Sequence, residues 1–132
     1  MVLWLNGGPG ASSVAGMLSE NGPLLINATG GLMVNPYSWT RIANLLVFEA
    51  PVGVGYSYCS SQANKGLCKN TDKLTASASR AALVDFYSKF PELRGKDFFI
   101  TGESYGRNRG CSPRVGVSVL VPVSDGLESS AK

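Results

Sequence analysis

Three short apolar runs, each ending in a turn rich in glycine or proline, constrain the fold of this chain most. They cover residues 2–5, 45–48 and 98–101, and they lead into Asn6-Gly7-Gly8, Glu49-Ala50-Pro51 and Gly102-Glu103-Ser104. Apolar runs without polar alternation are typical of parallel strands that are buried on both faces. Because helix-like segments separate the runs, the sequence predicts an α/β fold with parallel central strands and flanking helices.

The helix-like segments carry the signals that normally begin and end helices. Residues 11–18 suit a short helix with Ser12 or Ser13 near its start, and a turn at 35–39 leads into a helical stretch that ends near Ala43. The strongest helix prediction begins at Thr71, which can cap it, and ends at Pro91. Its expected packing face consists of Ala76, Ser79, Leu83, Phe86 and Phe90, which recur at steps of three and four residues.

The turn after the third strand, Gly102-Glu103-Ser104-Tyr105-Gly106, matches the G-x-S-x-G pattern of a nucleophile elbow. In such an elbow the serine lies on a strained turn between a strand and a helix, where flanking side chains would clash. The pentapeptide also occurs in ordinary loops, but the apolar strand before it favours a catalytic Ser104. Because ligands of α/β sheets bind beyond the carboxyl ends of the strands, all three turns are expected in one crevice.

A catalytic serine needs a base, which is nearly always a histidine. The chain of 132 residues contains no histidine. Either Ser104 is not catalytic or its base lies outside this chain. The apolar strand at residues 2–5 begins almost at the first residue, where chains are usually frayed. We therefore expect the chain to be part of a longer domain.

Two further features lie near the predicted crevice. The Gly7-Gly8-Pro9-Gly10 turn either presents backbone N–H groups to an oxyanion or is only a tight turn. Glu20 and Glu103 each lie in a glycine-rich turn. If their carboxyl groups are close, one pKa is raised, and the protonated group can donate a hydrogen bond to a substrate carboxylate in acid.

The composition indicates a globular chain, with 44% hydrophobic and 16% charged residues. The net charge of +3 is small, and basic residues do not cluster with aromatic ones, so we expect no nucleic-acid partner. No apolar run is long enough to span a bilayer. Because no Gly-Lys-Ser/Thr follows the glycine turn, a phosphate loop is not indicated. We expect neither a metal nor a cofactor.

Cysteine usage and a modification motif both favour the secretory pathway. The chain has three cysteines, and Cys59 and Cys68 flank a polar loop short enough for a local disulfide. Asn27-Ala28-Thr29 fits the N-glycosylation pattern, although so short a pattern is often matched by chance. The N-terminus has no basic segment before its apolar run and does not resemble a signal peptide.

Several motifs follow one another along residues 1–106: Trp4–Ser13 (WLNGGPGASS), Glu20–Pro23 (ENGP), Asn35–Trp39 (NPYSW), Asn44–Leu46 (NLL), Pro51–Tyr58 (PVGVGYSY) and Gly102–Gly106 (GESYG). Taken together, they resemble the serine carboxypeptidases of the α/β-hydrolase superfamily, and the resemblance covers residues 1–106. The resemblance implies an incomplete α/β-hydrolase domain that belongs to an enzyme releasing C-terminal residues from peptides at acidic pH. It also implies a vacuolar, lysosomal or extracellular location and peptide substrates with a free C-terminus.

The resemblance implies a role for each site residue. Ser104 is the nucleophile, and the backbone N–H groups of Gly8 and Tyr105 form the oxyanion hole. The substrate's C-terminal carboxylate is held by Asn6, Glu20 and Glu103, with Trp4 packed beside them. The family usually has cysteine where Ala11 stands. It also supplies a catalytic aspartate and histidine further along the chain.

Residues 107–132 resemble no part of the family, and we expect this tail to be frame-shifted or derived from an intron. The isolated chain is then an inactive fragment, with Val2–Leu5 and Phe98–Thr101 left as unpaired strand edges. One alternative is a related acyltransferase, which passes the acyl group to an alcohol; intact Glu20 and Glu103 favour a peptide carboxylate instead. Another alternative is a non-catalytic product that binds peptide C-termini.

Overall fold

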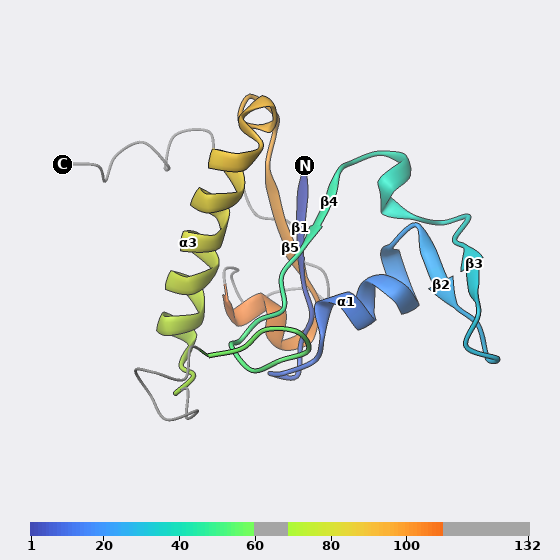
Figure 1. Ribbon diagram of the computed structural model, residues 1–132, viewed down its shortest axis with the longest axis horizontal. Helices are drawn as coiled ribbons and strands as arrows, with labels where there is room; N and C mark the ends of the chain where they lie inside the picture. The colour runs from blue at the N-terminus through green and yellow to red at the C-terminus, as the bar shows by residue number, and fades with distance from the viewer. Residues whose placement is uncertain (60–68, 110–132) are drawn as a thin grey trace.

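The computed structural model describes residues 1–59 and 69–109 (Figure 1). The strands are β1 (Val2–Leu5), β2 (Leu24–Ile26), β3 (Leu32–Val34), β4 (Leu45–Val47) and β5 (Phe99–Gly102). The helices are α1 (Ser13–Gly16), the π-helix η1 (Met17–Asn21), α3 (Asp72–Lys89) and the 3₁₀ helices η2 (Trp39–Arg41), η3 (Pro91–Leu93) and η4 (Ser104–Arg109).

The central sheet has the order β4-β1-β5, and both pairings are parallel. Its register places Trp4 beside Val47 of β4 and Leu5 beside Gly102 of β5. The carboxyl ends of the strands therefore meet at one edge, which confirms the predicted parallel sheet. The expectation that Val2–Leu5 is an unpaired edge is wrong, because this strand lies between the other two. In the described part of the chain, β4 and β5 are the outer strands.

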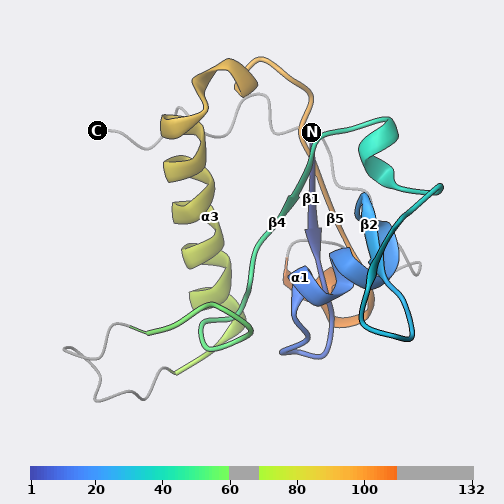
Figure 2. The same cartoon turned by 45° about the vertical axis from the view of Figure 1, so that its right-hand side comes forward.

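Alternation along β1 separates the two faces of the sheet. Met1, Leu3 and Leu5 join the buried cluster on the face that α3 covers, together with Leu83 and Tyr87 of that helix. Trp4 points to the other face, where its ring makes an edge-to-face contact with Trp39 at a centroid distance of 5.3 Å. Figures 1 and 2 show α3 on one side of the strands and α1 on the other. The sheet is thus a middle layer, as predicted for an α/β fold.

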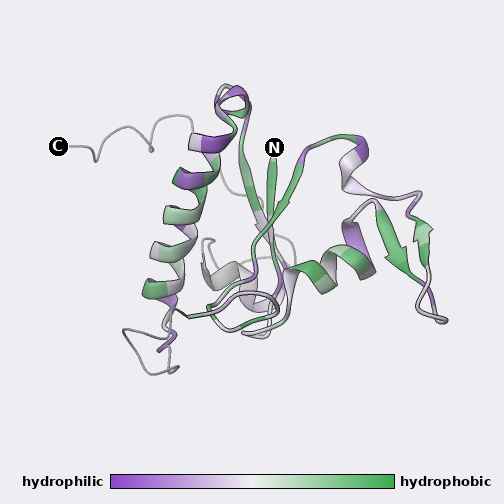
Figure 3. Ribbon diagram, in the orientation of Figure 1, coloured by the Kyte–Doolittle hydropathy of each residue, from purple (hydrophilic) through white to green (hydrophobic). Residues whose placement is uncertain are grey.

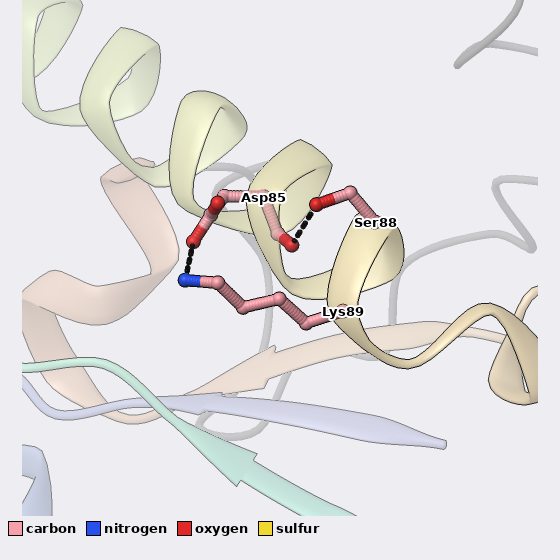
Figure 4. Close-up of polar contacts among 3 residues, drawn as sticks. All are labelled: Asp85, Ser88 and Lys89. Atoms are coloured by element: carbon pink, nitrogen blue, oxygen red, sulfur yellow. Dashed lines mark hydrogen bonds and ion pairs between the residues drawn. The ribbon is translucent and has the colours of Figure 1, made fainter.

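Helix α3 begins where the sequence predicts. Thr71 is its N-cap, and its Oγ1 accepts a hydrogen bond of 3.2 Å from the Leu74 N–H. The predicted packing face is partly wrong, because Ala76 and Phe90 are exposed while Thr75 and Tyr87 are buried. Near its end, Lys89 pairs with Asp85 at 2.6 Å and the Ser88 hydroxyl donates to the Asp85 carbonyl (Figure 4). That ion pair is exposed, so it stabilises the helix by only about 0.3–0.5 kcal/mol.

The antiparallel hairpin of β2 and β3, in which Leu24 pairs with Val34 and Ile26 with Leu32, was not predicted from the sequence. The hairpin projects away from the sheet on the side opposite α3 (Figure 1), and its strands are coloured as apolar in Figure 3. Several of its apolar side chains are nevertheless exposed, including Val34 at 73%. Each strand has only three residues, too few to give a periodic signal.

The predicted helix at residues 11–18 needs correction at both ends. The first helix begins at Ser13, with Ser12 as its N-cap, and continues as a π-helix to Asn21. A helical turn, η4, begins at Ser104 and extends to Arg109. The rest of the predicted tail lies outside the described residues. Among residues 1–59 and 69–109, no helix has the length and hydropathy needed to cross a membrane.

Candidate active site

Ser104 adopts the strained geometry that the elbow pattern predicts. Its φ is +47°, in the left-handed region that residues with a Cβ rarely adopt. The flanking glycines are required because the end of β1 lies directly against them. A Cβ at Gly102 would lie 2.7 Å from the Leu5 carbonyl oxygen, and a Cβ at Gly106 would clash with the same atom. The steric reason for G-x-S-x-G therefore lies in the neighbouring strand.

The glycine turn after β1 packs onto this elbow. A Cβ at Gly7 would lie 2.7 Å from the Ser104 Cβ and 3.1 Å from the Tyr105 nitrogen. The next residue, Gly8, has a φ of +108°, which a residue with a side chain would adopt only under strain. Gly8 and Ser104 are both exposed. The structure thus brings the glycine turn into contact with the elbow at Ser104 and Tyr105.

Asn6 connects the first turn to the second through a buried amide. Its Nδ2 donates to the Glu103 Oε1 at 3.3 Å, and its Oδ1 accepts from the Trp4 Nε1 at 2.7 Å. Its backbone N–H donates to the Ser13 hydroxyl at 3.2 Å. A side chain at Gly16 would overlap the Asn6 amide, so α1 leaves the space that this amide occupies. Both ends of the amide are therefore fixed in direction.

The pKa of the Glu20 carboxyl responds to Asn6 and Glu103. Burial raises the pKa of the Glu20 carboxyl above its ordinary value of 4.5, and the charge of Glu103 raises it further. A hydrogen bond from Asn6 acts in the opposite direction and lowers the same pKa. The pKa of Glu20 thus responds to both Glu103 and Asn6, in the directions expected for groups of one site. Trp4, Asn6, Glu20 and Glu103 form one group, which we call the carboxyl cluster.

The NPYSW segment supports the carboxyl cluster, a role that the sequence analysis missed. Asn35 is buried, and its Nδ2 donates to the backbone carbonyls of Glu20 at 3.0 Å and Gly22 at 2.9 Å. Ser38 donates through its hydroxyl to the Asn21 carbonyl at 3.3 Å. These bonds satisfy carbonyl groups at the end of η1, where the helix itself offers no donor. The only sign of this supporting role in the sequence is that Asn35 and Ser38 are polar residues within a turn.

Tyr105 makes a second contact that the sequence did not suggest. Its hydroxyl donates to the two carboxylate oxygens of Asp72 at 3.2 and 3.1 Å, which connects the elbow to the first turn of α3. Tyr105 and Asp72 also line a cavity of about 610 Å³ together with the backbone turns at Pro9-Gly10 and residues 51–54. This cavity lies beside the glycine turn, at the carboxyl edge of the sheet.

Some predicted features lie outside this arrangement. Within residues 1–59 and 69–109, no group forms a hydrogen bond with the Ser104 hydroxyl, and no set of histidine, cysteine and acidic side chains could hold a metal ion. Cys59 is disulfide-bonded, while Cys68, with which the sequence allows a local disulfide, lies outside the described residues. Ala11, where the family usually has cysteine, is exposed directly before the Ser12 cap.

Comparison with known proteins agrees with this geometry. A sequence model of the family described as serine carboxypeptidase matches residues 1–108. The chain is 51% identical over 107 residues to serine carboxypeptidase-like 35 of Arabidopsis thaliana, covering 80% of this chain and 22% of that protein. It is 47% identical over 106 residues to the lysosomal protective protein of Mus musculus, again covering 80% of this chain and 22% of the relative.

A solved structure shares the same arrangement of strands and helices. The crystal structure of Kex1(delta)p, a prohormone-processing carboxypeptidase from Saccharomyces cerevisiae, matches with a TM-score of 0.72 and 30% identity. The match covers 82% of this chain and 23% of that one, so the chain spans less than a quarter of this neighbour's length. The described fold is accordingly part of an α/β-hydrolase fold, and the chain belongs to the serine carboxypeptidase family.

Proposed function

We propose that this chain carries the nucleophile and the carboxylate-binding group of a serine carboxypeptidase that releases C-terminal residues from peptides. One observation carries the proposal. Ser104, strained at φ +47°, lies against the glycine turn, and Glu103 next to it in the chain is hydrogen-bonded to the buried Asn6. A nucleophile beside a group that recognises a terminal carboxylate suits cleavage of the last peptide bond.

In this proposal the Ser104 hydroxyl attacks the carbonyl carbon of the last peptide bond. The carbonyl oxygen gains negative charge, and the N–H groups of Gly8 and Tyr105 donate hydrogen bonds to it. Each such donor is worth about 3 kcal/mol of transition-state stabilisation. The proton taken from Ser104 is passed to the nitrogen as the C–N bond breaks, so the terminal amino acid leaves as an amine. Water then hydrolyses the acyl-serine and restores the Ser104 hydroxyl.

The proton of Ser104 needs an acceptor that this chain does not supply, because the sequence contains no histidine. We propose that the histidine and its aspartate belong to a longer protein, since the chain spans 22% of relatives such as serine carboxypeptidase-like 35. In subtilisin, loss of the catalytic histidine lowers turnover by about 10⁶-fold. The chain alone is therefore expected to have negligible peptidase activity.

The carboxyl cluster gives the proposal its substrate class and its pH range. Asn6 and a protonated Glu20 donate hydrogen bonds to the substrate's terminal carboxylate, and Trp4 packs beside them. Because the pKa of Glu20 is raised, the carboxyl stays protonated to a higher pH than an ordinary glutamate. Binding is then strongest in acid, which fits a vacuolar, lysosomal or extracellular protein; one relative is named lysosomal protective protein.

The decisive experiment supplies the missing base as free imidazole. The chain is incubated with a fluorophosphonate probe, with and without imidazole, and adducts are located by mass spectrometry. We expect imidazole-dependent labelling of Ser104 and none in Ser104→Ala. Labelling that is equal at other serines, such as the exposed Ser88 of α3, would refute an activated elbow.

Binding is tested separately from chemistry, because the carboxyl cluster lies wholly within this chain. Titration calorimetry compares a peptide that has a free C-terminus with the same peptide amidated. We expect the free peptide to bind at least tenfold more tightly in acid, with the difference lost in Asn6→Leu. Equal affinity for both peptides would contradict the assignment of the carboxyl cluster.

A further inference from the structure

The proposed peptidase function assigns no role to the tip of the β2–β3 hairpin. This tip contains Asn27-Ala28-Thr29 followed by two glycines, and residues 26–30 are all exposed. The hairpin lies on the far side of the sheet from α3 (Figures 1 and 2). A group attached at this tip would extend into solvent without entering the fold.

The side chain of Asn27 is held in one orientation by three hydrogen bonds to its oxygen. Oδ1 accepts from the Thr29 N–H at 3.0 Å, from the Thr29 hydroxyl at 2.8 Å and from the Gly31 N–H at 2.8 Å. These bonds fix the carbonyl end of the amide against the turn. Within the described residues, Nδ2 makes no hydrogen bond at all.

The absence of a side chain at Gly31 leaves space around Asn27 Nδ2. A Cβ at Gly31 would lie 3.2 Å from Nδ2, in tight contact, while a Cβ at Gly30 would meet nothing within 4 Å. Gly30 has a φ of +81°, which the turn needs and which disfavours a side chain there. Gly31 therefore keeps the amide nitrogen accessible, whereas Gly30 serves the turn itself.

We propose that Asn27 is a site of N-linked glycosylation, with an oligosaccharide on a lipid diphosphate as the donor. Nδ2 forms a bond to the anomeric carbon of the first sugar and loses a proton. The bond between that carbon and the diphosphate oxygen breaks, and the lipid diphosphate leaves. The Thr29 hydroxyl, bonded to the amide that reacts, is the third residue that the acceptor pattern requires.

A glycan on Asn27 would break none of the hydrogen bonds that the Asn27 side chain makes. All three hydrogen bonds of the Asn27 side chain use Oδ1, and the sugar attaches to Nδ2. The neighbouring strands also expose apolar side chains, with Ile26 at 53% and Leu32 at 61%. A glycan at the tip would shield this apolar surface from other molecules.

The test translates the full chain behind a cleavable leader in the presence of microsomes and analyses only the protease-protected, leader-cleaved product. We expect a single-glycan mobility shift that peptide-N-glycosidase removes, leaving aspartate at position 27 by mass spectrometry. Asn27→Gln and Thr29→Ala lose the shift, whereas Asn70→Gln, which fits no acceptor pattern, retains it. Thr29→Ser keeps the hydroxyl and retains glycosylation, which separates the motif's chemistry from misfolding.

Protected product that remains unglycosylated would overturn the proposal, as would a glycan that persists in Asn27→Gln. The proposal requires a secretory route but neither an active Ser104 nor peptide binding. Ser104→Ala should therefore be glycosylated as fully as the wild-type chain.

Discussion

The elbow around Ser104 depends on contacts between two strands at the scale of single atoms. Gly106 has no side chain because the Leu5 carbonyl of β1 occupies the place where a Cβ would lie. The sequence pattern alone predicted glycine at this position. It did not predict which atom enforces it, because that requires the pairing of β1 with β5.

Gly106→Ala should therefore lower the free energy of unfolding by about 1–3 kcal/mol, the usual cost of overpacking a closely packed site. The matched control is Gly95→Ala, where an added Cβ meets nothing within 4 Å. We expect the control to change stability by less than about 0.5 kcal/mol. Urea denaturation of both variants checks this, and equal midpoints would show that the elbow tolerates a side chain.

The Glu20 carboxyl should make the free energy of unfolding depend on pH. Its pKa is raised in the folded chain, so the folded state holds the proton more tightly than the unfolded state does. The contribution of Glu20 to stability is thus greatest in acid and declines as the pH rises from about 4.5 through the raised pKa. Glu20→Gln should remove this decline.

Glu103→Gln tests the cause of the shift, because it removes the charge and keeps an oxygen for the Asn6 amide. The pKa of Glu20 should fall part of the way, since burial is the larger cause and remains. Carbon-13 NMR titration of the Glu20 carboxyl measures this, with Glu92→Gln in η3 as the control. A pKa of Glu20 that is the same in Glu103→Gln and the wild-type chain would mean that the two carboxyls do not interact.

At the scale of elements, the NPYSW turn holds the π-helix that carries Glu20. Asn35 donates two hydrogen bonds to that segment from a site with 4% exposure. Asn35→Asp keeps the shape and replaces the donor by a carboxyl beside two carbonyl oxygens. We expect a loss of about 1–3 kcal/mol in stability, the cost of leaving buried polar groups unpaired.

A purely structural role for Asn35 would leave peptide recognition intact in the fraction that remains folded. If instead Asn35 positions Glu20, the folded variant should bind free-C-terminal peptide more weakly and show a changed pH dependence of binding. Calorimetry at several pH values distinguishes the two cases. Asn44→Asp, an exposed substitution in the loop before β4, is the matched control and should change neither quantity.

At the scale of the whole molecule, features with a local pattern in the sequence could be predicted, whereas contacts between distant segments could not. The parallel sheet and the contact between its turns were predictable because each strand gave a local apolar signal and topology fixes where parallel strands end. The contacts of Asn35, Ser38 and Asp72 were not predictable. Each joins segments distant in the chain through a single polar side chain, which leaves no periodic trace in the sequence.

The same architecture makes the isolated chain prone to association. Strands β4 and β5 are the outer strands of the described sheet, and the β2–β3 hairpin exposes Leu32 and Val34. Open edges and exposed apolar surface favour pairing between copies. Sedimentation velocity should therefore show oligomers that grow with protein concentration. A monomer at every concentration would show that these strand edges and apolar side chains do not drive association.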